Sequence, residues 1–198
     1  MAGLFDLKGH LAFYRAYHSN ETNVTIHLIC IPIILSSAIF ILSKFSLPIS
    51  IPLLEGYVPH QFINFGTLLS TTYGIYYILL DWQVGIPAAL FYGGVGLVYN
   101  QLYYFHAPSL LSSITKEELF RFSWITHIVA WLAQFYGHAF HEHRAPALLD
   151  NLLQAVVLAP FFVAFEVAFW LGFKLDTQKY MEVEAAKQRK LFETKKSA

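Results

Sequence analysis

Long apolar stretches separated by short polar ones dominate the pattern along this chain. Four of them, at 24–42, 62–80, 84–105 and 122–140, approach the length of roughly 20 mostly apolar residues that a helix needs to cross a bilayer. The second and third contain no charged residue. We therefore predict an all-α integral membrane protein, built as a bundle of four transmembrane helices.

A fifth apolar run, at 151–173, has a different character. Pro160 lies near its middle and Glu166 follows, so the run combines a helix-breaking residue with a charge. We expect it to re-enter the membrane or to lie along the interface, without crossing fully.

The remaining stretches are polar or broken. The 44–61 stretch contains three prolines and is predicted to be a loop. Residues 174–198 form a polar tail rich in helix-favouring side chains, which predicts a C-terminal helix in the cytosol. The chain 1–198 is then a single membrane domain, with no internal repeat.

Composition supports the membrane interpretation and excludes other classes. Hydrophobic residues make up 56% of the chain and charged residues 13%, whereas soluble domains carry about a quarter charged residues. The formal net charge is zero, which argues against a nucleic-acid partner. The single cysteine, Cys30, excludes an internal disulfide framework and a cysteine zinc site.

The charge distribution predicts orientation and location. Seven of the thirteen basic residues lie from Lys174 onward, which places the C-terminus in the cytosol by the positive-inside rule. The last four residues, Lys-Lys-Ser-Ala, resemble a dilysine retrieval signal of the endoplasmic reticulum. We expect a multi-pass protein of that membrane with both termini cytosolic.

Ionisable groups at membrane depth are candidates for function, and here several share one helix face. At steps of three or four along 122–142 lie His127, Trp131, Gln134, His138 and then His141 or Glu142. His138 and Glu142, at i and i+4, can point at one centre and suit a divalent iron, manganese or zinc ion.

A second group lies near the N-terminus. His10, Tyr14 and His18 fall on one face of a short predicted helix, and Asn23 is a suitable N-cap for the first span. His27 lies in that span's first turn. With a cytosolic N-terminus, His18 and His27 lie on the same side of the membrane as His138 and Glu142, so the two groups can form one metal site. Alternatively, these histidines only form structural hydrogen bonds.

Two blocks of sequence resemble a known family. The matching residues of the first block are Tyr17, His18, Asn23, His27 and Pro32. Those of the second are Gln134, Phe135, Gly137, His138, Glu142, Arg144, Pro146, Asp150 and Asn151. The chain is similar to the fungal 2-hydroxy fatty acid dioxygenase family of the endoplasmic reticulum, whereas di-iron hydroxylase boxes and the HExxH motif are absent.

The resemblance implies an Fe(II)-dependent α-oxidation of a 2-hydroxy fatty acid by dioxygen, in phytosphingosine breakdown. It implies His18, His27 and His138 as ligands, with Glu142 as a fourth ligand or the residue that orients one. Arg144 and Tyr17 are candidates for substrate binding, and Asn23, Gln134 and Asn151 for hydrogen bonds to the ligands. A set completed by His106 or His127 stays open.

The expected partners are the 2-hydroxy fatty acid, dioxygen and membrane lipid, and a homo-oligomer is left open. Two rival functions remain at this point. One is a non-enzymatic lipid-binding or membrane-shaping bundle, whose histidines only form hydrogen bonds. The other is a metal-dependent lipid hydrolase, in which the same ligands would activate water.

Overall fold

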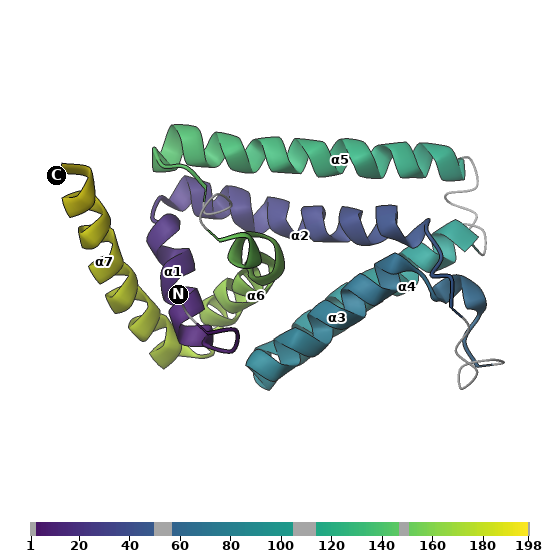
Figure 1. Ribbon diagram of the computed structural model, residues 1–198, viewed down its shortest axis with the longest axis horizontal. Helices are drawn as coiled ribbons and strands as arrows, with labels where there is room; N and C mark the ends of the chain where they lie inside the picture. Colours follow the sequence, from purple (N-terminus) through teal and green to yellow (C-terminus); the bar gives the residue numbers. More distant parts are fainter. Residues whose placement is uncertain (1–2, 50–56, 105–113, 147–150, 198) are drawn as a thin grey trace.

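The computed structural model describes residues 3–49, 57–104, 114–146 and 151–197, and these form helices and short connections (Figure 1). Helices α2 (Glu21–Ser43) and α5 (Lys116–Tyr136) lie side by side along the length of the molecule. Helices α3 (Phe65–Leu80) and α4 (Trp82–Tyr104) form a hairpin that packs against α2. The all-helical class predicted from the sequence is confirmed.

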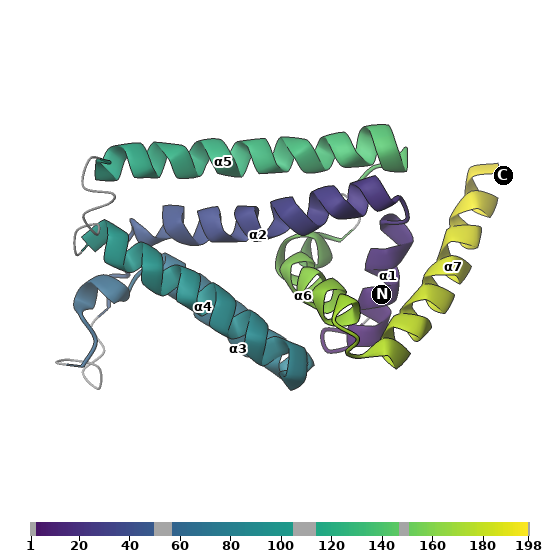
Figure 2. The same cartoon turned by 180° about the vertical axis from the view of Figure 1, so that it is seen from behind.

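The other helices gather at one end of the molecule and run across it (Figure 2). They are α1 (Leu7–Tyr17), the π-helices η4 (Gly137–Glu142) and η6 (Leu153–Leu158), α6 (Ala159–Trp170) and α7 (Leu175–Ser197). The predicted polar C-terminal helix is α7, and it packs on α1. Both described termini therefore lie at this end.

Polar contacts fasten α7 to α1. The Arg15 guanidinium donates to the Glu182 carboxylate at 2.7 Å. The Lys8 ammonium lies 5.2 Å from the centre of the Tyr180 ring, in reach of a cation–π contact. Because α1 leads directly into α2, the C-terminal helix is held near the start of α2.

Two helical stretches are long and apolar enough to cross a membrane, judged by length and composition. They are α2 and the continuous stretch Leu153–Trp170, while α3 is apolar but shorter. The fifth run, expected to re-enter or lie along the interface, thus meets this criterion. Among the described residues, three of the four predicted spans, those at 62–80, 84–105 and 122–140, do not meet it. The four-span bundle stays a prediction.

The outer faces of α3, α4 and α5 are strongly apolar. Their exposed large side chains include Ile75, Leu79, Leu90, Phe91, Leu97, Ile125, Val129 and Leu132. Many exposed large apolar side chains on a helix face are typical of contact with lipid or with another protein. It fits association with a membrane.

Helix starts are defined by local capping. The Asn20 side chain accepts from the backbone N–H groups of Thr22 and Asn23 and so caps α2. The prediction that Asn23 caps this helix is wrong, because the helix begins earlier and leaves the Asn23 amide free for another contact. Thr115 and Glu118 form a capping box at the start of α5.

The predicted 44–61 loop is described only in part. Residues 50–56 lie outside the described ranges, and a short 3₁₀ helix, η2, spans His60–Phe62. Asn64 then caps α3 by accepting from the Thr67 N–H group. Outside this loop, the ends of the predicted apolar runs and of the observed helices differ by a few residues.

Candidate metal centre

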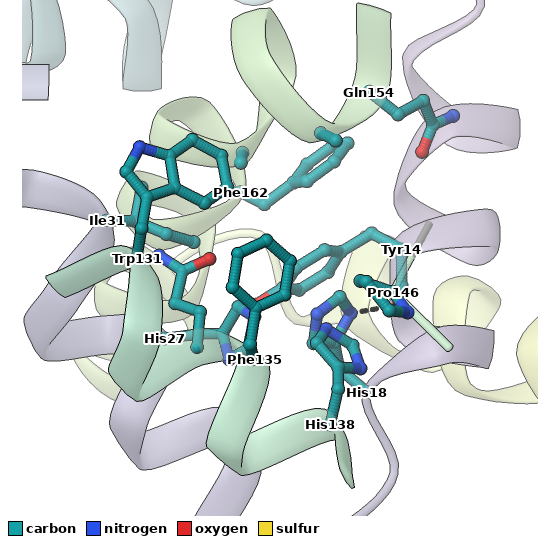
Figure 3. A pocket seen from close by; sticks show the side chains of 13 residues that line it. Tyr14, His18, His27, Ile31, Trp131, Phe135, His138, Pro146, Gln154 and Phe162 are labelled. Atoms are coloured by element: carbon teal, nitrogen blue, oxygen red, sulfur yellow. Dashed lines mark hydrogen bonds between the residues drawn. The ribbon is translucent and has the colours of Figure 1, made fainter. Parts of the chain in front are cut away.

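Three buried histidines from three different segments converge at the end of the molecule that carries α1 and α7. One ring nitrogen of each of His18, His27 and His138 lies within 4.8 Å of those of the others. The ring centroids are 4.5 Å apart for His18 and His27, and 5.0 and 4.9 Å for His138 with each. Figure 3 shows these rings grouped beside the ring of Tyr14.

Backbone contacts fix how two of the rings present their nitrogens. The Nδ1 atom of His18 lies 2.8 Å from the Tyr14 carbonyl oxygen, and that of His27 lies 2.9 Å from the Asn23 carbonyl oxygen. Since a carbonyl oxygen only accepts, each Nδ1 carries the proton and each Nε2 keeps its lone pair. A metal-ligating histidine usually donates its other ring N–H group to a hydrogen-bond acceptor in this way.

Two other ring nitrogens in the cluster have no hydrogen-bond partner among the described residues, whereas a purely structural histidine would have one. His18 Nε2 and His138 Nδ1 are buried and have no hydrogen-bond partner in the described part of the chain. Burial, and next the neighbouring His27, hold the pKa of His18 well below its usual range. A neutral imidazole is the form that binds a metal, so the three residues fit a divalent transition metal with coordination positions left open.

Glu142 lies beside this cluster and joins the segments that carry the histidines. Its carboxylate accepts from the Ser19 N–H group at 2.9 Å, the Ser19 hydroxyl at 2.5 Å, the Asn20 N–H group at 3.1 Å and the Asn23 amide at 3.1 Å. It is not among the residues whose ligand atoms converge. Its contacts join the turn η4 to the start of α2, and both roles predicted for it stay predictions.

These contacts also control the charge of Glu142. Burial on its own would raise the pKa of the carboxyl group, but the hydrogen bonds from Ser19, Asn20 and Asn23 outweigh it and hold the pKa below the usual value. The carboxylate therefore stays ionised at neutral pH and acts as an anionic cap on the start of α2.

A change in helix geometry brings His138 to the cluster. Helix α5 ends at Tyr136, and the π-helical turn η4 carries His138 and Glu142. Gly137 permits the close approach of this turn to α2, because a Cβ atom there would overlap the Asn23 side chain. His143 then adopts a left-handed conformation, with φ of 52°, and ends the turn.

Other predicted residues lie outside the cluster. His127 contacts the Ser37 hydroxyl at 2.9 Å through Nδ1 and accepts from the Trp131 indole at 3.1 Å through Nε2, so both of its nitrogens are already used. His141 contacts the Tyr136 ring. His106 lies outside the described residues.

The predicted substrate-binding residues pair with each other. The Arg144 guanidinium lies 3.9 Å from the centre of the Tyr17 ring. Neither residue lines the cavity beside the histidines, although Pro146 does. Asn151 accepts from the Gln154 N–H group at the start of η6.

A small cavity of about 40 Å³ opens beside the three histidines. Its polar lining includes Tyr14, Gln134 and Gln154, and its apolar lining comes from α2, α5, η6 and α6. Gln154 also contacts His10 through its amide nitrogen at 2.7 Å. The sequence did not single out Tyr14 or Gln154 as site residues. The one signal for Tyr14 was its position on the same helix face as His18.

Comparison with known proteins shows which family this chain resembles. A family model described as "2-hydroxy-palmitic acid dioxygenase Mpo1-like" matches residues 4–171. The chain is 36% identical, over 96% of its own length and 95% of the relative's, to a Saccharomyces cerevisiae protein named 2-hydroxy-palmitic acid dioxygenase MPO1. No solved structure matches the chain significantly.

Proposed function

Because the chain belongs to the Mpo1-like family of dioxygenases, we propose that it is an Fe(II)-dependent 2-hydroxy fatty acid dioxygenase. The reaction takes a 2-hydroxy acid and dioxygen to the fatty acid one carbon shorter, carbon dioxide and water. The bond between C1 and C2 breaks, and the substrate supplies all four electrons that dioxygen takes up. No flavin, haem or separate reductant is needed.

The observation that carries the proposal is the convergence of three buried histidines beside a cavity. His18, His27 and His138 would hold the metal, and three protein ligands leave positions for substrate and dioxygen. Iron(II), when bound, supplies the one-electron chemistry that lets dioxygen react with a closed-shell acid. The apolar lining from α5 and α6 can contact the first carbons of the acyl chain, next to the head group of the substrate.

The remaining candidate residues hold the ligands in place. Glu142 ties η4 to the start of α2 through Ser19, Asn20 and Asn23, and so keeps His138 beside His27. The Asn23 carbonyl orients the His27 ring. The Gln134 amide lines the cavity, and the Asn151 side chain accepts a hydrogen bond from the Gln154 N–H group.

We assign Arg144 and Tyr17 a role in binding the substrate carboxylate near the histidine cluster. The guanidinium lies two residues after Glu142, stacked on the Tyr17 ring. There it can attract the carboxylate of an acid that arrives from the membrane interface and pair with it. Stacking on an aromatic ring limits the directions in which the guanidinium points.

We further propose that the protein acts in the endoplasmic reticulum membrane, with both termini in the cytosol, in phytosphingosine breakdown. The basic tail and its terminal Lys-Lys-Ser-Ala support the location. The packing of α7 on α1 supports termini on one side.

Oxygen uptake tests the proposal directly. The purified protein, loaded with Fe(II), should consume one dioxygen for each 2-hydroxy acid and release one carbon dioxide. The non-hydroxylated acid of the same length should give no uptake. Loss of an acyl ester with no oxygen uptake would instead support the metal-dependent hydrolase, and absence of both reactions would contradict an enzymatic role.

A further inference from the structure

Tyr14 has a buried hydroxyl group that no contact of the fold explains. The residue is 4% exposed, and its Oη atom has no hydrogen-bond partner among the described residues. The ring is held from two sides, with centroid distances of 4.3 Å to His18 and 4.6 Å to Phe162. Figure 3 shows Tyr14 among the side chains that line the cavity.

Two other buried tyrosines have hydrogen-bond partners for their hydroxyl groups. The Tyr77 hydroxyl donates to the Val157 carbonyl at 2.7 Å, and the Tyr73 hydroxyl donates to the Val156 carbonyl at 3.4 Å. A buried hydroxyl without a partner destabilises a folded chain. A phenylalanine would pack the same ring without that penalty, so the Tyr14 hydroxyl points to a ligand.

The chemistry of the phenol indicates which kind of ligand group it takes. A neutral hydroxyl suits it, because a phenol can both donate to and accept from such a group.

The substrate of the proposed reaction carries such a group on the carbon next to its carboxylate. We infer that Tyr14 binds the 2-hydroxyl of the substrate and makes the site select 2-hydroxy acids over plain fatty acids. The inference rests on the function proposed above. Since Tyr14 stacks on His18, a hydroxyl held there also lies beside the three-histidine cluster, where C2 must react. A site that pairs a substrate hydroxyl rejects the analogue without it, because its own polar group is then left unpaired.

Binding without turnover tests the inference. Dissociation constants are measured by calorimetry on iron-loaded protein in the absence of dioxygen, for a 2-hydroxy fatty acid and for the plain acid of equal length. Tyr14→Phe should weaken binding of the 2-hydroxy acid by about 5- to 10-fold, the worth of one neutral hydrogen bond. Its affinity for the plain acid and its iron content should match the wild type.

Tyr77→Phe is the matched control, because it removes the hydroxyl of a buried tyrosine that does not line this cavity. It should lower the melting temperature and leave the preference for the 2-hydroxy acid intact. The inference would be overturned if Tyr14→Phe weakened the binding of both acids equally, or of neither acid. It would also be overturned if Tyr77→Phe lost the preference for the 2-hydroxy acid to the same extent. A wild-type protein that shows no preference and takes up no oxygen would contradict the proposed function itself.

Discussion

A metal site built from imidazoles depends on the tautomer of each ring. The tautomer is set by the hydrogen bond of the ring nitrogen that does not bind the metal. In His18 and His27 the Nδ1 proton is held by the carbonyl oxygen four residues earlier, so helix geometry alone orients both rings. His138 has no such contact at Nδ1. Its orientation depends on the turn η4, which Glu142 joins to the start of α2.

Replacement of His138 tests the ligand set. His138→Ala should lower the iron content at least about 10-fold and abolish oxygen uptake, since loss of a ligand costs no less than loss of a residue that supports one. Metal analysis of the purified variant measures this. His143→Asn is a suitable control, because His143 is exposed and asparagine tolerates its positive φ. A wild-type iron content in His138→Ala would exclude His138 as a ligand.

The Glu142 carboxylate should contribute stability that depends on pH. Because its pKa is lowered in the folded chain, this contribution is complete above the usual carboxyl range and is lost as pH falls through the lowered pKa. Glu142→Gln should lower the free energy of unfolding by about 1–3 kcal/mol at pH 7, since donors that face a carboxylate are left unpaired. Denaturant melts at pH 7 and pH 4 check this, and the difference between variant and wild type should be smaller at pH 4.

Arg144 should affect substrate binding and leave metal binding unchanged. Arg144→Gln should keep its iron and raise the 2-hydroxy acid concentration for half-maximal rate by about 10-fold, if the guanidinium pairs with the carboxylate. Steady-state oxygen uptake at varied substrate concentration gives this number. An unchanged concentration dependence would contradict a pairing of Arg144 with the substrate carboxylate.

At the scale of elements, the site depends on how closely one helix turn approaches another. The turn η4 meets α2 at Gly137, where there is no room for a side chain beside Asn23. The π-helical geometry of η4 follows directly on α5 and shifts the register of the residues that it carries. The geometry of this turn therefore decides where His138 lies relative to the other two histidines.

Gly137→Ala tests that contact. The added methyl group should push η4 away from α2, lower the free energy of unfolding by about 1–3 kcal/mol, and lower iron retention because His138 moves away from His27. Gly93→Ala is the matched control in α4, where nothing lies within 4 Å of the added atom. Gly93→Ala should leave the free energy of unfolding unchanged or raise it by up to about 1 kcal/mol. Equal iron retention in both variants would contradict the close-approach argument.

At the scale of the whole molecule, the two ends of the chain share the side that carries the candidate centre. Helix α7 packs on α1, and α1 leads through His18 into α2. Helix α6 gathers with them at this end, whereas α2 and α5 extend away from it (Figure 1). If α2 and α5 cross the membrane, this arrangement favours the prediction that the apolar run at 151–173 does not cross it.

Topology mapping tests this arrangement. Glycosylation acceptor sites added at each terminus should both stay unmodified in microsomes, because both ends are expected in the cytosol. An acceptor site inserted in a loop that faces the lumen serves as the positive control. Modification of the C-terminal site alone would show that the Leu153–Trp170 stretch crosses the membrane after all.

The sequence by itself determined the helical class, the approximate ends of the helices and the identity of the three histidines. Apolar periodicity and run length are local properties, and His18, His27 and His138 lie in the two blocks that carry the family resemblance. The N-cap of α2 was misplaced by three residues, from Asn20 to Asn23. Both are capping residues, and only the observed hydrogen bonds distinguish them.

Tertiary structure decided which polar groups meet. Glu142 has the right spacing for a ligand, but donors from the start of α2 surround its carboxylate, and these lie more than a hundred residues earlier in the chain. Tyr14 and Gln154 come together from opposite ends of the chain to line one cavity. Such contacts depend on helix packing across long sequence separations, and no local pattern encodes which buried hydroxyl is left without a partner.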